Sequence, residues 1–409
     1  MMLLPSFASN RSAITIAKRL GCQRGIYIPR VTERKVNERG PGGRSSESGQ
    51  IVAVFGAGGF LGRYVCYNNG SNGVKTYVGN RADEFEMRHL NPMFDLGRLR
   101  KVFYSPRDRD SMAEVIADAD VVVNLVGKHY ETRCLSNTSK FPYLEIKTNF
   151  TFEDCNVSIP RTIAELCTEM QVDNLIHVSS LAAKEDALSE WSRTKWQGEM
   201  AVREAYPWAT VVRPSQLFGH EDRLLHYYAN AANMLPFVPF IAGSQALTQP
   251  VYVGDIADVI SRVIDDPERF EGKTIDCFGP DDFTYRELAE FVYDITSQEP
   301  KMRDIPKSAY KALAKFTQVI ANPSLTTDLV DLWSENYTPR MSQEEYKAQS
   351  RAKDGILTMI DFDIEPVPVQ KIAFEYLHRF RQGGHFILAE SYHGRKNQDI
   401  PVEAHHIKQ

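Results

Sequence analysis

The residues best suited to chemistry are glycines that follow an apolar run near residue 50. Ile51 to Phe55 is uninterrupted and apolar, typical of a buried parallel strand, and it leads directly into a glycine-rich turn. The turn reads Gly56, Ala57, Gly58, Gly59, Phe60, Leu61 and Gly62. Glycines remove the side chains that would keep a pyrophosphate from backbone amides at the start of a helix. The spacing predicts a dinucleotide-binding turn, with a purely structural connector as the alternative.

The residues after the second predicted strand indicate which dinucleotide binds. NAD-binding proteins place an acid there to bind the ribose hydroxyls, but this chain has Asn80 and Arg81. An arginine pairs with a 2′-phosphate, which a carboxylate would repel. Arg81 therefore favours NADPH, with Arg63 as a second candidate and Asp108 as a candidate for the adenine edge. The alternative is that these side chains are solvated surface residues.

Strand-like and helix-like segments alternate through the first half of the chain. Apolar runs predict strands at 74–78, 102–104, 121–126, 175–178 and 210–212, and periodic segments predict helices at 110–117, 159–170 and 189–204. Such alternation predicts an α/β fold with a doubly wound parallel sheet of the Rossmann type. Beyond Pro214 the regularity breaks. Strand-like pieces at 250–253 and 273–278 and a helix at 285–296, capped by Thr284 and Glu287, indicate a smaller mixed α/β lobe.

The domain prediction therefore has four parts. Residues 1–45 form a leader, 50–220 the nucleotide-binding domain, 221–381 the smaller lobe with segments that return to the sheet, and 382–409 a docked or disordered tail. The first 30 residues contain no Asp or Glu. Their basic residues are Arg11, Lys18, Arg19, Arg24 and Arg30. This composition is typical of a mitochondrial transit peptide, and a disordered basic arm is the alternative.

Composition argues against nucleic-acid binding, a metal site and a membrane-spanning segment. A net charge of −5 argues against nucleic acid as the main partner. The six cysteines form no Cys-x-x-Cys pair, so neither a zinc site nor an iron–sulfur cluster is encoded. No apolar stretch reaches the length of a membrane span. The nearest candidate, 234–242, is broken by Pro236 and Pro239, and it predicts either a loop that touches a membrane or partner or a buried loop.

Several further motifs resemble those of the extended and atypical short-chain dehydrogenases, over about residues 50 to 300. The motifs are Gly56-x-x-Gly59-x-x-Gly62, Val122 to Gly127, His177 to Ser180, Val211 to Pro214 and Gln249 to Asp255. The resemblance implies additional coenzyme contacts at Leu125, Val126, Gly127, Ser179, Lys195 and Pro214.

The resemblance also implies a Tyr-x-x-x-Lys pair, in which the tyrosine transfers a proton and the lysine lowers its pKa. This chain has Trp191 at the tyrosine position and keeps Lys195. An indole N–H donates a hydrogen bond but releases no proton near neutral pH. The position aligned with the family's catalytic hydroxyl is Leu181, although a shift of one residue makes it Ser180. We therefore predict no catalytic residue, with Tyr130 as an alternative proton donor.

A basic leader, an NADPH-favouring turn and an altered catalytic pair together are similar to one group in that family, the nucleotide-binding accessory subunits of mitochondrial respiratory complex I. This resemblance implies a non-catalytic subunit, peripheral on the matrix side of the inner membrane, which binds NADPH tightly for stability or assembly. Its partners are other subunits of the complex, with membrane lipid at the matrix face as a further candidate. An active NADP-dependent dehydrogenase or epimerase and an NADPH redox sensor stay open as alternatives.

Overall fold

A single eight-stranded sheet positions the glycine turn. Its strands run in the order β16-β13-β8-β7-β4-β1-β2-β3, and every neighbouring pair is parallel. The strands are β1 (Ile51–Phe55), β2 (Lys75–Asn80), β3 (Leu99–Phe103), β4 (Val121–Asn124), β7 (Asn174–Val178), β8 (Thr210–Pro214), β13 (Thr274–Cys277) and β16 (Ile356–Thr358). The chain leaves β1 toward β2 and β3 and then returns to the other side of β1 as β4. The ends of β1 and β4 therefore form the switch point at which such sheets bind ligands.

The computed structural model describes residues 43–81, 83–136, 145–241, 245–318, 323, 325–339 and 355–381, with the backbone alone for part of the segment 132–148. Most of the predicted leader (1–45) and the whole predicted tail (382–409) lie outside the described residues.

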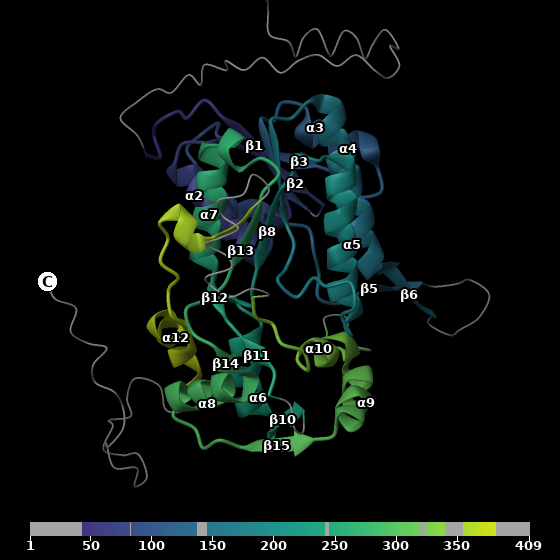
Figure 1. The fold of residues 1–409 in the computed structure, drawn as a ribbon, viewed down its shortest axis with the longest axis vertical. Coiled ribbons are helices and arrows are strands. Elements are labelled where there is room, and N and C mark those ends of the chain that lie inside the picture. The colour runs from purple at the N-terminus through teal and green to yellow at the C-terminus, as the bar shows by residue number, and fades with distance from the viewer. Residues whose placement is uncertain are drawn as a thin grey trace, which may run out of the picture. The chain divides into compact units, whose positions relative to one another are not determined.

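Helices cover both faces of the sheet, as Figure 1 shows. Val52 and Val54 of β1 pack in one apolar cluster with α2 (Phe60–Ser71) and α7 (Val253–Asp265). Ala53 and Phe55 point to the opposite face and pack with α3 (Arg109–Ile116) and α4 (Ile159–Met170), which α5 (Glu190–Ala205) joins. Because alternate residues of β1 are buried on opposite faces, the strand is apolar throughout. The predicted doubly wound fold is confirmed.

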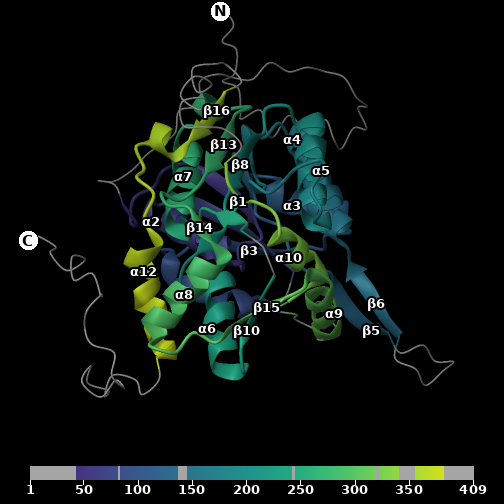
Figure 2. The ribbon, with the colours of Figure 1, turned by 60° about the horizontal axis from the view of Figure 1, so that its bottom comes forward.

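The remaining helices gather beyond the carboxyl ends of the strands (Figure 2). They are α6 (Leu224–Met234), α8 (Tyr285–Thr296), α9 (Lys307–Thr317), α10 (Thr327–Leu332) and α12 (Val369–Leu377). The short helices are spread along the chain as η1 (Glu84–Met93), η2 (Asp154–Ser158), η3 (Glu268–Phe270), η4 (Met359–Phe362) and η5 (His378–Phe380). Thr284 and Glu287 form the predicted capping box of α8. An aromatic-rich cluster that includes Tyr228 and Trp333 is the core of this lobe.

Four two-stranded sheets complete the described structure. They pair β9 (Leu217–Phe218) with β12 (Val251–Tyr252), β10 (Val238–Ile241) with β15 (Met302–Ile305), β11 (Leu247–Thr248) with β14 (Phe283–Thr284), and β5 (Thr132–Ser136) with β6 (Glu145–Phe150). The β5–β6 hairpin was not predicted. Part of the proposed loop 234–242 is strand β10, while Met234 is 81% exposed. β13 and β16 extend the main sheet from beyond residue 221, and the division into two domains stays a prediction.

Asp255 of α7 forms a hydrogen bond with the segment that precedes α12. Its Oδ2 accepts a hydrogen bond of 2.8 Å from the backbone N–H of Val367, although its side chain is buried. Burial raises the pKa of Asp255 to about 6. Because the unfolded pKa is near the ordinary value of 3.8, the folded protein binds more protons between about pH 4 and 6. The contribution of Asp255 to stability therefore falls as the pH rises through this window, and the ionised group costs stability at neutral pH.

We predict that Asp255→Asn raises the thermal midpoint of unfolding at pH 7.5 by a few degrees, because the amide oxygen still accepts from Val367 but carries no buried charge. At pH 4 the gain should shrink, since Asp255 is then protonated in the folded wild type. Calorimetry of both proteins at the two pH values tests this. Destabilisation at pH 7.5, or an equal gain at both values, would contradict it.

Candidate functional site

The glycine turn touches the segment after β4 so closely that side chains are excluded. Gly56 has φ +85°, and a Cβ there would lie 3.0 Å from the carbonyl carbon and oxygen of Leu125. A Cβ at Gly62 would lie 2.6 Å from the backbone of Gly56 and Ala57. At these two positions the turn must be glycine. The backbone of the turn therefore lies directly against the backbone of the segment after β4, at the switch point. A turn without side chains there leaves its amides open to a pyrophosphate.

The start of α2 has the open amides that an anion needs. Gly59 is its N-cap, with no capping side chain, and its N–H donates to the Gly56 carbonyl at 3.0 Å. No acid occupies the first turn of α2. Phe60 and Leu61 begin the helix and pack against the sheet cluster. Gly58 is less constrained, because a Cβ there would meet only the flexible end of Met87, at 2.8 Å.

The residues predicted to choose the dinucleotide have different surroundings. Arg81 is exposed directly after β2, and its guanidinium carbon lies 5.7 Å from the ring centroid of Phe150. Asn80 is buried, and its Nδ2 donates to the Asp83 carbonyl at 3.2 Å. Arg63 forms an ion pair with Glu221. A role of Arg63 in binding the 2′-phosphate stays a prediction. Arg81, in contrast, forms no ion pair with a described carboxylate.

Asp108, Val126 and Pro214 lie near the carboxyl edge of the sheet. Asp108 is the N-cap of α3, where its Oδ1 accepts from the N–H of Asp110 at 3.2 Å. The N–H of Val126 donates to Asn124 Oδ1 at 3.0 Å, which fixes the turn after β4. Pro214 ends β8. Their predicted coenzyme contacts stay predictions.

Lys195 brings the ends of β4 and β7 together. It lies on α5, is buried, and its Nζ donates to the Val178 carbonyl at 3.3 Å. A Cβ at Gly127 would lie 3.0 Å from the same Nζ. Burial lowers the pKa of Lys195 to about 8. The buried Ser179 Oγ, at the end of β7, has no hydrogen-bond partner in the described part of the chain. Lys195 and Ser179 therefore offer donors that a ribose could use.

Trp191 stands one helical turn before Lys195, at the position where the family motif has tyrosine. Its ring is buried and lies 4.7 Å from that of His129 between centroids. It also packs in a cluster with Phe152, Leu181 and Leu332. The indole nitrogen is buried and has no hydrogen-bond partner among described atoms. Its surroundings are therefore those of a packed core side chain.

Tyr337 is a site residue that the sequence did not reveal. Its hydroxyl lies 2.5 Å from Ser180 Oγ and 3.4 Å from the Pro214 carbonyl oxygen. Burial raises the pKa of Tyr337 to about 12, whereas a proton donor of this family needs a lowered pKa. The contact joins residues 157 positions apart, so no local pattern could have predicted it. Tyr130, the earlier alternative donor, instead lies between Lys128 and Arg223, each 5.4 Å from its ring centroid.

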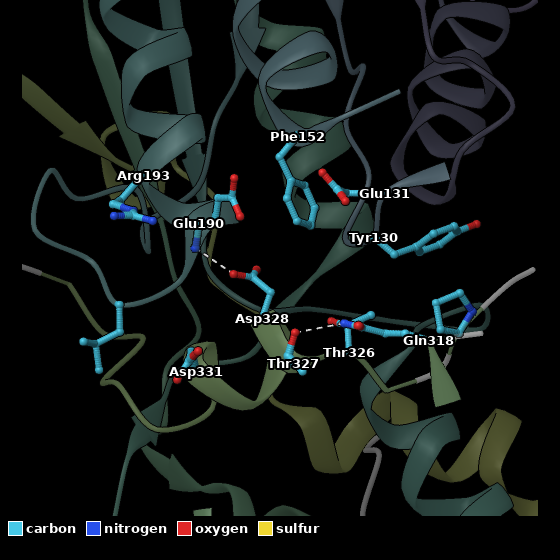
Figure 3. Close-up of a pocket in the computed structure, with 12 residues that line it drawn as sticks. Tyr130, Glu131, Phe152, Glu190, Arg193, Gln318, Thr326, Thr327, Asp328 and Asp331 are labelled. Carbon is cyan, nitrogen blue, oxygen red and sulfur yellow. Dashed lines mark hydrogen bonds between the residues drawn. The ribbon is translucent and has the colours of Figure 1, made fainter. Parts of the chain in front are cut away.

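A polar cavity of about 290 Å³ lies between the start of α5 and α10 (Figure 3). Its lining includes the acids Glu131, Glu190, Asp328 and Asp331. Asp328 points toward α5, where it accepts from the backbone N–H of Glu190 at 2.6 Å and from Ser189 Oγ at 2.8 Å. An acidic lining disfavours phosphates. The four acids outnumber the one basic residue of the lining, Arg193, and Asp328 caps the start of α5.

Other kinds of site find little support in the described residues. They contain no group of three or more His, Cys, Asp or Glu that could hold a metal ion. The described cysteines Cys66, Cys155, Cys167 and Cys277 are buried and free. None of the described helices is long and apolar enough to cross a membrane.

Comparison with known proteins identifies related sequences. The model of the NAD dependent epimerase/dehydratase family matches residues 52–277. The Arabidopsis thaliana protein named NADH dehydrogenase (ubiquinone) 1 alpha subcomplex subunit 9, mitochondrial, is 35% identical over 351 residues, 85% of this chain and 82% of that protein. The Neurospora crassa NADH-ubiquinone oxidoreductase 40 kDa subunit, mitochondrial, is 30% identical over 97% of this chain and 98% of that protein.

Solved structures share the fold at low identity. The dTDP-glucose 4,6-dehydratase of Bacillus anthracis, in complex with NAD, has a TM-score of 0.55 and 15% identity, covering 81% of this chain and 96% of that one. The triphenylmethane reductase of Citrobacter sp. has a TM-score of 0.58 and 14% identity, covering 80% and 99%. These likenesses concern the fold alone.

We predict that Gly62→Ala lowers both the thermal midpoint and the amount of dinucleotide that copurifies with the protein, because the added methyl group collides with backbone. The matched control is Gly58→Ala in the same turn, where the methyl group meets a movable methionine end. Nucleotide content per mole of purified protein and thermal unfolding are the measurements. Equal effects of the two substitutions would show that the close approach is not what the turn requires.

Proposed function

Because this chain belongs to the NAD dependent epimerase/dehydratase family, and within it to the group of mitochondrial NADH-ubiquinone oxidoreductase subunits, we propose that it is an accessory subunit of respiratory complex I that holds NADPH without transferring hydride. The observation that carries the non-catalytic part is Trp191, buried where the family motif requires tyrosine. A side chain that releases no proton cannot protonate a substrate carbonyl.

The residues around the switch point fit a dinucleotide. The glycine turn and the uncapped start of α2 would hold the pyrophosphate, and Lys195 with Ser179 would hold the nicotinamide ribose. In an active enzyme such a coenzyme would supply a hydride. Arg81, with no acid at the end of β2, favours NADPH over NADH because a guanidinium pairs with the 2′-phosphate.

Tight binding gives the coenzyme a structural role. A ligand that binds only the folded state stabilises it by RT ln(1 + [L]/Kd). The turn, β4 and α5 all meet at the candidate site, through Gly56, Leu125 and Lys195. A dinucleotide bound there would join the two halves of the sheet. In this proposal NADPH supports folding and assembly of the subunit.

The proposed location is the matrix face of the inner membrane, with other complex I subunits as partners. The related proteins carry the word mitochondrial in their names, and the acid-free N-terminal segment has the composition of a transit peptide. A peripheral position agrees with the helices that the structure describes.

An active NADP-dependent reductase is the competing function, and the Ser180–Tyr337 hydroxyl pair favours it. Such an enzyme would oxidise NADPH in the presence of a carbonyl compound and lose this activity in Tyr337→Phe. We expect no carbonyl-dependent NADPH oxidation by the wild type in a spectrophotometric assay over a panel of ketones and aldehydes. Turnover that Tyr337→Phe abolishes would overturn the non-catalytic proposal.

We predict that Arg81→Glu lowers the NADPH content of complex I and the amount of assembled complex, because the new carboxylate repels the 2′-phosphate. Nucleotide extracted from the band on a native gel and the intensity of that band measure both effects. Arg88→Glu is the control, since Arg88 is also an exposed arginine but lies within η1 and does not directly follow β2. Unchanged NADPH content in Arg81→Glu would contradict the prediction.

We predict that NADPH binding weakens as the pH rises through about 8. The pKa of Lys195 is about 8 in the protein without ligand. A coenzyme that accepts hydrogen bonds from the ammonium raises this pKa, so binding takes up a proton above pH 8 and loses affinity there. Titrations between pH 7 and 9 measure the slope, which Lys195→Met should remove. A wild-type affinity independent of pH in this range would speak against the role of Lys195.

A further inference from the structure

Two arginines from different loops lie over the same aromatic ring. The guanidinium carbon of Arg81 is 5.7 Å from the ring centroid of Phe150, and that of Arg107 is 4.6 Å from it. Phe150 is the last residue of β6, at the base of the hairpin inserted after β4. The ring therefore brings two cations to one place at the edge of the sheet.

The strand order explains why the two arginines meet. β2 and β3 are parallel neighbours, and Asn80 pairs with Phe103 at their carboxyl ends. Arg81 directly follows β2, and Arg107 lies in the short turn between β3 and α3. Arg107 is also anchored to the hairpin, because its Nη2 donates to the Asn149 carbonyl at 2.5 Å and to Asn149 Oδ1 at 3.2 Å.

These cations have no described counter-charge. Neither Arg81 nor Arg107 forms an ion pair with a described carboxylate, and the neighbouring Asp108 directs its Oδ1 to the N–H of Asp110. Lys128 is a third basic side chain near them, because repulsion from Arg81 is, after burial, a cause that lowers the pKa of Lys128. Like charges held together are unfavourable unless an anion joins them. A phosphate dianion suits this arrangement, because guanidinium groups present planar, paired donors to it.

We infer that Arg107 is the second arm of a clamp for the 2′-phosphate of NADPH, and that Phe150 is a positioning residue that holds Arg107 and Arg81 side by side. This inference rests on the proposed function, because it concerns the coenzyme assigned there. It replaces Arg63 as the assistant of Arg81, since Arg63 is paired with Glu221. It also gives the β5–β6 hairpin a role in coenzyme selection.

The test compares NADPH with NADH, which differ only in the 2′-phosphate. Dissociation constants of both are measured by fluorescence titration of the full chain. In Arg107→Ala we expect the NADPH constant to rise about tenfold or more, while the NADH constant changes by less than about twofold. Phe150→Leu should lower the preference for NADPH in the same direction by a smaller factor. The matched control is Arg109→Ala, because Arg109 is an exposed arginine two positions away that pairs with Glu165 and Glu169.

Unaltered NADH binding shows that each variant is folded. The inference is overturned if Arg107→Ala leaves NADPH binding unchanged, or weakens both coenzymes equally, while the wild type prefers NADPH. Arg107→Lys keeps the charge without the paired donors and should show an intermediate loss of NADPH preference. A wild type that binds neither coenzyme, or that prefers NADH, would instead overturn the proposed function together with the inference. Failure of the inference alone can therefore be distinguished from failure of the proposed function.

Discussion

The structure depends on one close approach, between the glycine turn after β1 and the segment after β4. A Cβ at Gly56 would press on the Leu125 carbonyl, and a Cβ at Gly62 would press on the turn itself. Side chains are therefore excluded where the chain changes direction across the sheet, and backbone amides line the space instead. Helix α2 begins at the end of this turn, and no side chain caps its start. The remaining candidate groups, from Lys195 to Arg81, surround this point.

Under the proposed function, apolar packing takes the place of the family's catalytic groups. Trp191 joins an apolar cluster with Leu332 and Tyr337, which come from the lobe, and the Tyr337 hydroxyl bonds to Ser180. Asp328 fastens the same lobe segment to the start of α5. These contacts tie the lobe to the helix that carries Lys195. A bound coenzyme and the lobe would therefore support each other, as expected for a ligand with a structural role.

Charge around the candidate site is divided between its two ends. Arginines and a lysine without described carboxylate partners lie near the carboxyl ends of β2, β3 and β4, whereas acids line the cavity between α5 and α10. An elongated ligand with phosphates at one end would be oriented by this division. The β5–β6 hairpin contributes through Phe150, so an insertion in the fold shapes the basic end.

The sequence by itself determined the local features. Strand β1, the glycine turn, helix α4 and the capping box of α8 were all predictable, because apolar period, turn glycines and caps act over a few residues. The resemblance to the family placed Trp191 at the tyrosine position, and that correspondence stays a prediction. Only the tertiary structure decided that Arg63 pairs with Glu221, that Arg107 shares a ring with Arg81, and that Tyr337 reaches Ser180. These contacts join residues 43 to 158 positions apart, where strand order and packing, and not local preference, set which side chains meet.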